Sequence, residues 1–468
     1  MNRPDTERSS TVPDAAATTG NSRRTIWTAA LTIALAAIAV RLPLLAAPGF
    51  MHDQEQFVEW GFVARTQGLA EVYDFRPTAG GPKRLSNYPP LQIVLCRLVA
   101  GAYGIVTDRE LDAGVLDEVA RRERTPSARS AYALFKVPAV LADAALAALL
   151  CVWLGRRCSW RFGASVGGVY ALLPGVWHNS AVWGAVDAWP ALFVCISLEM
   201  TRRRHRTGMW AAAALAVLTK PQALVFAPIW IVATLRPKAP DGGQIARMAG
   251  VVAVLVVVFV APFAGNLGGV WDAYGGAPGF YPLTHLNGFS AWFLDCPLVE
   301  PHLSDNLAEH YLRDDTAGGL GMTPRTWGLV GFAGVVVYVV RLMWRRSADE
   351  ESLRHAAMIL PLAFFVLSTQ MHERYLFPAV AAWAWAARRQ PGWWVGWIAL
   401  SLGAAVNVFW VWVGPFEGPW ASDLSSRLHS TWLGASPGAW VAWALVAILV
   451  VTLLTNRRET QVRPTVES

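Results

Sequence analysis

The sequence predicts an all-α membrane protein, a polytopic bundle of about twelve transmembrane helices with a long external first loop. Of the 468 residues 54% are apolar and only 16% are charged, whereas a soluble domain carries about 25% charged residues. The apolar residues form runs such as Ile26–Val40 and Val251–Phe263. The 24 Trp suit membrane–water interfaces, where the ring is buried and its N–H stays hydrated.

Twelve apolar segments are the expected spans. Several are shorter than the roughly 20 residues of a straight span, so we expect them to borrow flanking residues or to form broken helices buried in protein. The segments are Ile26–Ala47, Tyr132–Leu154, Phe162–Trp177, Val182–Leu198, Met209–Leu218, Leu224–Leu235, Met248–Phe263, Trp327–Met343, Ala356–Leu367, Tyr375–Ala387, Trp393–Val413 and Ala439–Leu454.

The distribution of Lys and Arg predicts the orientation. Beyond Leu154 most of them lie in every second connection, which the positive-inside rule assigns to the cytoplasm. Both termini are then cytoplasmic, and residues 48–130 and 264–326 form external loops. The segment Leu91–Val106 is apolar but has Arg97 at its centre, and counting it as a span would invert this charge distribution. We therefore expect an interfacial helix there.

Residues 1–24 and 456–468 are expected to be cytoplasmic tails, the first of them disordered because it is rich in Ser, Thr, Pro, Asp and Ala. No cleavage site of a signal peptide is visible. The net charge of +7 does not indicate nucleic acid, because most Arg lie between apolar runs. The five Cys lack metal-ligand spacing. The Ala, Arg, Gly and Trp bias suggests a bacterium, and hence its plasma membrane.

The first external loop opens with the acidic stretch from Met51 to Trp60. Asp53 and Glu55 lie just past the first span, where a half-buried carboxylate suits a general base. Alternatively, Asp53 caps a helix. The same loop ends in Tyr88-Pro89-Pro90, an extended stretch that permits a helix to start.

Further polar residues lie at or within the expected spans. His178, Asn179, Trp183 and Asp187 fall on one outer connection. Lys136 and Asp143 share a helical face, where they either face a cavity or form an internal pair. Lys220-Pro221-Gln222 places a cation at a break between two short helices. His372-Glu373-Arg374 crowds three ionisable groups between two apolar runs, which a simple turn does not require.

These motifs resemble the GT-C superfamily of membrane glycosyltransferases. The resemblance rests on Asp53-x-Glu55 followed by Trp60, on Tyr88-Pro89-Pro90 and on His372-Glu373-Arg374. It is strongest to the lipid-phosphate-glucose-dependent glucosyltransferases of N-glycan precursor assembly and to bacterial mannosyltransferases. The stretch from Tyr281 to Trp292 resembles the external Asn/Trp segment of these enzymes, with Ser290 where their pattern has Asn.

The resemblance implies transfer of a hexose from a polyprenyl-phosphate donor to a hydroxyl of a lipid-linked or other glycan acceptor. It implies that Asp53 is the catalytic base, with Glu55 as its rival, and that His372 and Arg374 lie near the donor phosphate. Lys220 and Lys136 are further candidates for that phosphate. We expect an inverting reaction without metal or cofactor. The candidate substrate contacts are Trp60, Tyr88, His178, Asp187, His285, Asn287, Trp292 and Glu373.

The main alternative function is a transporter or flippase of a lipid-linked or polar substrate, which also needs charges in its spans and broken helices. Against it, no internal repeat is evident and the polar residues gather on one face. A scaffold protein is a third hypothesis, but it has no need of His372-Glu373-Arg374 at a span end. Convergence of Asp53, His372 and Arg374 in one outer-facing cavity favours the transferase.

Overall fold

The computed structural model describes residues 15–74, 86–275, 282–295, 313–414, 419–431 and 435–461. Parts of the predicted external loops and tails, including Tyr281 and Cys296, lie outside the described residues. Helix α1 begins at Ala15 and α19 ends at Gln461. Residues 15–24 and 456–461, predicted to be tails, are therefore helical. No Gly or Pro interrupts residues 456–461, so the helix has no local reason to end earlier.

The described elements are almost all helical, and their bounds fall into two halves. The first half contains α1 (Ala15–Leu45), α2 (Met51–Thr66), η1 (Ala70–Tyr73), α3 (Pro90–Thr107), α4 (Ala113–Ala120), α5 (Pro126–Arg157), α6 (Trp160–Leu172), α7 (Pro174–Trp177), the π-helix η2 (His178–Trp183), α8 (Ala188–Arg202) and α9 (Arg206–Thr219). The second half contains η3 (Pro221–Phe226), α10 (Ala227–Leu235), α11 (Gly242–Val260), η4 (Ala261–Asn266), α12 (Leu267–Gly275), β1 (His285–Leu286), η5 (Ala291–Asp295), η6 (Gly319–Gly321), α14 (Pro324–Arg345), α15 (Glu350–Leu367), β2 (Met371–His372), α16 (Phe377–Trp385), α17 (Pro391–Val411), α18 (Pro419–His429) and α19 (Pro437–Gln461).

The chain forms a helical bundle, and each of the twelve predicted segments overlaps a helix. Within the described residues, seven helices are long and apolar enough to cross a membrane. They are Arg23–Leu45, Pro90–Thr107, Pro126–Arg157, Gly242–Gly275, Pro324–Arg345, Pro391–Val411 and Pro437–Thr455. Six of the seven coincide with predicted spans, whereas Pro90–Thr107 contains the segment that we predicted to be interfacial.

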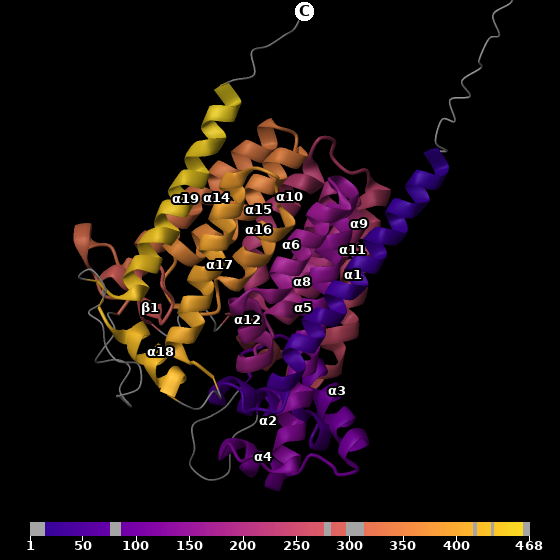
Figure 1. Cartoon of the computed structure of the whole chain (residues 1–468), viewed down its shortest axis with the longest axis vertical. Coiled ribbons are helices and arrows are strands. Elements are labelled where there is room, and N and C mark those ends of the chain that lie inside the picture. Colours follow the sequence, from indigo (N-terminus) through magenta and orange to yellow (C-terminus); the bar gives the residue numbers. More distant parts are fainter. Residues whose placement is uncertain are drawn as a thin grey trace, which may run out of the picture.

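The long helices α1 and α5 lie antiparallel. Near one end Ile26 packs against Gly155, and near the other Lys136 Nζ donates hydrogen bonds to the carbonyls of Leu44 and Ala47, over 3.2 and 2.7 Å. The start of α1 and the end of α19 share one end of the bundle, hereafter the terminal end (Figure 1). Helices α2, α3 and α4 gather at the opposite end, hereafter the loop end (Figure 1).

The surroundings of α3 favour a peripheral helix. Its neighbours on both sides lie at the loop end: Gln54 of α2 donates to the Tyr132 carbonyl, and Tyr103 of α3 donates to the Ser127 carbonyl, both near the start of α5. The chain thus enters and leaves α3 at the same end of the α1–α5 pair. The absence of a crossing by α3 stays a prediction.

Several short helices lie inside the bundle. All nine residues of α16 are buried, and most of the 15 residues of α8 are buried. The predicted span Val182–Leu198 is wrong at its start, because the π-helix ends at Trp183, Gly184 has φ +83°, and α8 begins only at Ala188. Such breaks are stable where neighbouring protein supplies the missing hydrogen bonds.

A two-stranded parallel pairing joins distant loops at the loop end. His285 and Leu286 of β1 align with Met371 and His372 of β2. This pairing fixes the segment before Glu373 and Arg374 against the second loop, and thereby positions two of the predicted site residues.

Candidate functional site

Asp53 and Arg374 meet at the loop end, although 320 residues separate them along the chain. Arg374 Nη1 lies 2.9 Å from Asp53 Oδ2, and Nη2 donates a 3.4 Å hydrogen bond to Oδ1. Trp183 Nε1 donates a 2.5 Å hydrogen bond to Asp53 Oδ2. Among the described residues Arg374 Nη1 has no aligned hydrogen-bond acceptor, so one donor of the guanidinium is left for another acceptor.

Asp53 lies in the first turn of α2, which begins at Met51 after the N-cap residue Phe50. The interpretation of Asp53 as the helix cap is therefore wrong. Its carboxylate points to Trp183 and Arg374 instead of the helix backbone. Glu55, two residues further along α2, is half-buried. Residues two apart on a helix face different directions, so the two carboxylates do not form one pair.

Three acceptors hold the segment before Arg374 in place. The buried carboxylate of Asp314 accepts hydrogen bonds from Thr369 Oγ1 at 2.7 Å and Gln370 Nε2 at 2.8 Å, and it pairs with Arg325 at 2.7 Å. The Met371 carbonyl accepts from the Gly288 amide at 3.0 Å, and the Leu367 carbonyl accepts from Trp292 Nε1 at 2.7 Å. Asp314 is a residue that the sequence analysis missed, because nothing local distinguishes it from Asp315.

Glu373 orients Arg374 from the other side. Its Oε1 accepts a 3.0 Å hydrogen bond from Arg374 Nε, and its Oε2 lies 3.7 Å from His372 Nδ1. Burial alone raises the pKa of the Glu373 carboxyl, but the hydrogen bond with His372 and the Arg374 charge bring it below its usual value. Glu373 therefore stays ionised, and Arg374 lies between two carboxylates.

A second ion pair lies beside this cluster. Lys220, in the break between α9 and η3, pairs with Asp187 just before α8. Asn179 Nδ2 donates to Asp187 Oδ2 at 3.4 Å. The Lys220 ammonium lies 5.7 Å from the Tyr88 ring centroid and 5.0 Å from that of Tyr375. The predicted cation at this helix break is confirmed, and it has a carboxylate partner.

Tyr88 connects the two ion pairs. Its phenol hydrogen-bonds with Arg374, while its ring lies under Lys220. Pro89 is extended and α3 begins at Pro90, as predicted. Trp60 is fully buried, 5.5 Å from the Tyr88 ring, so it supports Tyr88 from behind and is not exposed to a substrate.

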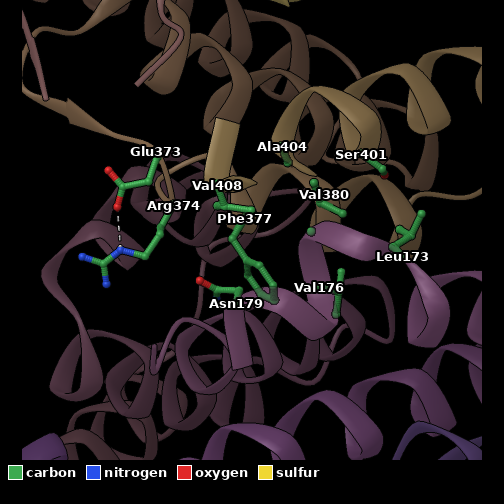
Figure 2. A pocket seen from close by; sticks show the side chains of 11 residues that line it. Leu173, Val176, Asn179, Glu373, Arg374, Phe377, Val380, Ser401, Ala404 and Val408 are labelled. Atoms are coloured by element: carbon green, nitrogen blue, oxygen red, sulfur yellow. Dashed lines mark hydrogen bonds and ion pairs between the residues drawn. The ribbon is translucent and has the colours of Figure 1, made fainter. Parts of the chain in front are cut away.

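Two small cavities adjoin the cluster. One, of about 10 Å³, has Glu373, Arg374 and Asn179 on one side and apolar residues of α7, α16 and α17 on the other (Figure 2). The second, of about 20 Å³, lies beside Asp187, Lys220 and Tyr375 and is otherwise mostly apolar. Each has room for about one water molecule. A sugar phosphate therefore does not fit into either cavity as it stands.

Lys136 and His178 are held away from the cluster. The ammonium of Lys136 binds the final carbonyls of α1, and Asp143 pairs with Arg41 at 3.4 Å. The alternative of a Lys136–Asp143 pair is therefore wrong: Arg41 reaches Asp143 from α1 and satisfies it within the bundle. The buried His178 ring lies 3.0 Å from the Trp412 carbonyl and packs against Phe409.

The second loop supports the cluster and does not line it. His285 is 2% exposed and packs against Phe293, and burial lowers the pKa of its imidazole to about 4. Asn287 has φ +62°, and its carbonyl accepts from Asn407 Nδ2 at 2.6 Å. Trp292 is bound to the end of α15. These three predicted contacts to substrate thus hold the β1–β2 pairing together.

No protein-family model matches this chain, and no curated protein matches its sequence. Within the described residues, no three His, Cys, Asp or Glu side chains lie close enough to hold a metal ion. Independence from metals stays a prediction. The site thus consists of a carboxylate on α2, a guanidinium between two acids, and a Lys–Asp pair at the ends of short buried helices.

Proposed function

We propose that the protein is a GT-C-type glycosyltransferase that transfers a hexose from a polyprenyl-phosphate donor to an acceptor hydroxyl at the loop end. The observation that carries this proposal is the direct contact between Asp53 and Arg374. It combines a carboxylate able to accept a proton with a guanidinium suited to a phosphate. Tyr88, Glu373 and the Lys220–Asp187 pair adjoin this contact.

Arg374 is the best candidate for the donor phosphate. A guanidinium binds phosphate oxygens through parallel N–H donors, and Arg374 Nη1 has no aligned acceptor among the described residues. His372, 24% exposed, lies next to it in sequence and at the cluster's surface. Lys220 supplies a second cation through Asp187. Lys136 is excluded from this role by its bonds to α1.

The proposed reaction is a direct displacement. Asp53 takes the proton of the acceptor hydroxyl, and the hydroxyl oxygen forms a bond to the anomeric carbon. The bond from that carbon to the phosphate oxygen breaks, and the polyprenyl phosphate leaves with the electron pair. The guanidinium of Arg374 stabilises the growing negative charge of the phosphate. A single displacement inverts the anomeric centre.

The described geometry corresponds to a closed site. Asp53 accepts from Trp183 and contacts Arg374, so a donor phosphate competes with Asp53 for the guanidinium. Phosphate binding then releases one oxygen of Asp53 toward the acceptor, which couples donor binding to activation of the base. The small cavities require that the Asp53–Arg374 contact opens when a sugar enters.

For the membrane we propose twelve crossings, with both termini cytoplasmic and the site at the outer face of a bacterial plasma membrane. The charge distribution supports this orientation. The burial of short helices such as α8 and α16 supports crossings by helices shorter than the bilayer core.

A Cys at position 117 of a Cys-free variant tests the topology. Asp117 is exposed on α4, and it lies beyond α3. We expect a membrane-impermeant maleimide to label it only from the outer side of intact cells. Labelling only from the cytoplasmic side contradicts the proposed topology and makes α3 a span.

The transfer itself is tested by incubating the purified protein with a panel of polyprenyl-phosphate sugars and an acceptor pool. The assay measures release of polyprenyl phosphate and is repeated with EDTA, which we expect to have no effect. Asp117→Asn is the matched control for Asp53→Asn, because its carboxylate also pairs with an Arg but is 72% exposed. Substrate movement across liposomes without release of lipid phosphate favours the transporter instead.

A further inference from the structure

A second charged cavity lies at the terminal end, remote from the Asp53–Arg374 cluster. It has a volume of about 490 Å³, within the range of about 300–1,000 Å³ of small-molecule sites. The turn between α8 and α9, the segment after α10 and the first turns of α11 line it. Asp187 precedes α8 and Thr201 closes it, so its 15 residues separate the two sites by about 22 Å.

The lining of this cavity is strongly basic. It contains Arg204, His205, Arg206, Lys238 and Arg247, and none of its lining residues is acidic. The nearby Asp241 is occupied as the cap of α11, because its carboxylate accepts from the Gln244 amide at 2.8 Å. The positive charge of the cavity is therefore not neutralised from within.

These cations differ from the other cations at the terminal end. Arg157, Arg202 and Arg203 pair with Glu199, and Arg388 pairs with Glu351. Within the described part of the chain, no cation of the cavity makes an ion pair. Arg206 donates to Gln244 Oε1 at 3.0 Å and to the Lys238 carbonyl, and Arg204 donates to the Ser347 carbonyl at 3.3 Å. The Arg206 bonds orient the cavity wall without cancelling its charge.

The position of the cavity places it at a membrane boundary. Gln244, Arg247 and Met248 of α11 line it, and the same helix then presents an exposed apolar face that includes Val254 and Val257. That helix belongs to a segment apolar enough to cross a membrane. A headgroup in the cavity would therefore have its acyl chains beside α11, and basic pockets between membrane helices suit anionic headgroups.

We propose that this cavity binds the phosphate group of an anionic ligand, either the headgroup of an acidic phospholipid or a soluble phosphate. Lys238 and Arg247 supply the unpaired charge, and Arg206 shapes the wall. The site is separate from the proposed transferase centre and does not depend on its activity.

The test compares binding of dihexanoyl-phosphatidylglycerol, dihexanoyl-phosphatidylcholine and inorganic phosphate to the full-length protein in neutral detergent. Microscale thermophoresis measures each Kd for the wild type and for the double variant Lys238→Gln/Arg247→Gln. Both side chains are exposed, so we expect the variant to fold. Arg156→Gln/Arg161→Gln is the control, because these exposed Arg lie outside the cavity against Trp27 and Trp160.

We expect phosphatidylglycerol to bind more tightly than phosphatidylcholine, and its affinity to fall about tenfold or more in the double variant but not in the control. Arg247→Gln alone should show a smaller loss, which protects the test if the double variant does not fold. Inorganic phosphate binding that depends on the same two residues, without binding of phosphatidylglycerol, identifies a soluble phosphate as the source. Equal affinities in wild type and both variants, or an equal loss in the control, overturn the proposal.

Discussion

The two ends of the bundle each bury a cluster of Arg and carboxylate groups, but with opposite composition. At the terminal end one carboxylate, Glu199, is surrounded by three Arg and by Trp385, whose Nε1 donates a 3.3 Å hydrogen bond. At the loop end one guanidinium, Arg374, lies between the carboxylates of Asp53 and Glu373. The first cluster has surplus positive charge and the second has surplus negative charge.

The two clusters also differ in how they are built. Arg202 and Arg203 are three and four residues from Glu199 on the same helix end, so neighbouring turns supply most of that cluster. The Asp53–Arg374 contact joins α2 to a loop after β2, and small cavities adjoin it. This difference teaches that the Glu199 cluster stabilises packing, whereas the Arg374 cluster keeps groups available for chemistry.

The largest expected effect comes from Asp53→Asn. We expect the transfer rate to fall by about 10²–10⁴ because the proton acceptor is lost. Donor affinity and the thermal unfolding midpoint should change little, since Glu373 still compensates Arg374. Single-turnover kinetics and a donor binding titration measure the two quantities separately.

Glu55→Gln is the companion variant, and we expect it to lower the rate less than Asp53→Asn does. A dead Glu55→Gln beside an active Asp53→Asn reverses the two roles. Full activity of both variants removes the base from this loop and favours the transporter.

Glu199→Gln should have the converse phenotype. Removing a buried carboxylate from three Arg costs stability, by about 3 kcal/mol, at the low end for buried pairs because Arg202 and Arg203 reach solvent. The specific activity of the folded fraction should stay unchanged. Thermal unfolding in detergent measures the loss, with the half-exposed Glu350→Gln as a control that should cost less than about 1 kcal/mol. A loss of activity without a loss of stability contradicts the structural role.

Arg374→Ala should weaken donor binding by about 2–5 kcal/mol, because a desolvated phosphate loses its charged partner. It also leaves Asp53 and Glu373 without their cation, so Arg374→Lys is the variant that separates folding from binding: it keeps the charge but loses the planar fork. His372→Ala, at a partly exposed position, should fold normally and bind or turn over donor less well. Wild-type turnover in the His372 and Arg374 variants excludes both residues from the site.

The smallest effect concerns His285. Its pKa of about 4 lies below the usual 6.5, so the folded state binds fewer protons than the unfolded state. The resulting contribution is complete above about pH 6.5 and is lost as the pH falls toward 4; at pH 5 the loss is about 2 kcal/mol. His285→Phe, which keeps a ring against Phe293, should reduce the destabilisation between pH 7 and pH 5 by that amount. An unchanged pH slope of the unfolding midpoint contradicts this prediction.

Much of the site was predictable as types of residue, but not as a geometry. Asp53, Lys220, Asp187 and the segment from His372 to Arg374 stand out in the sequence because charge is costly between apolar runs. Their partners do not stand out. Arg41 satisfies Asp143, and Asp314 holds Thr369 and Gln370, because contacts across long separations depend on how the helices pack.

The sequence by itself determined the helical membrane class, the positions of the twelve apolar segments and the helix start at Pro90, because local hydrophobicity and proline geometry act over a few residues. Only the tertiary structure decided that Asp53 faces Arg374 instead of capping α2, that Lys136 binds the end of α1, and that His285 and Trp292 support a loop. Each of these outcomes depends on which helix ends meet at the loop end, and the packing of the whole bundle determines that meeting.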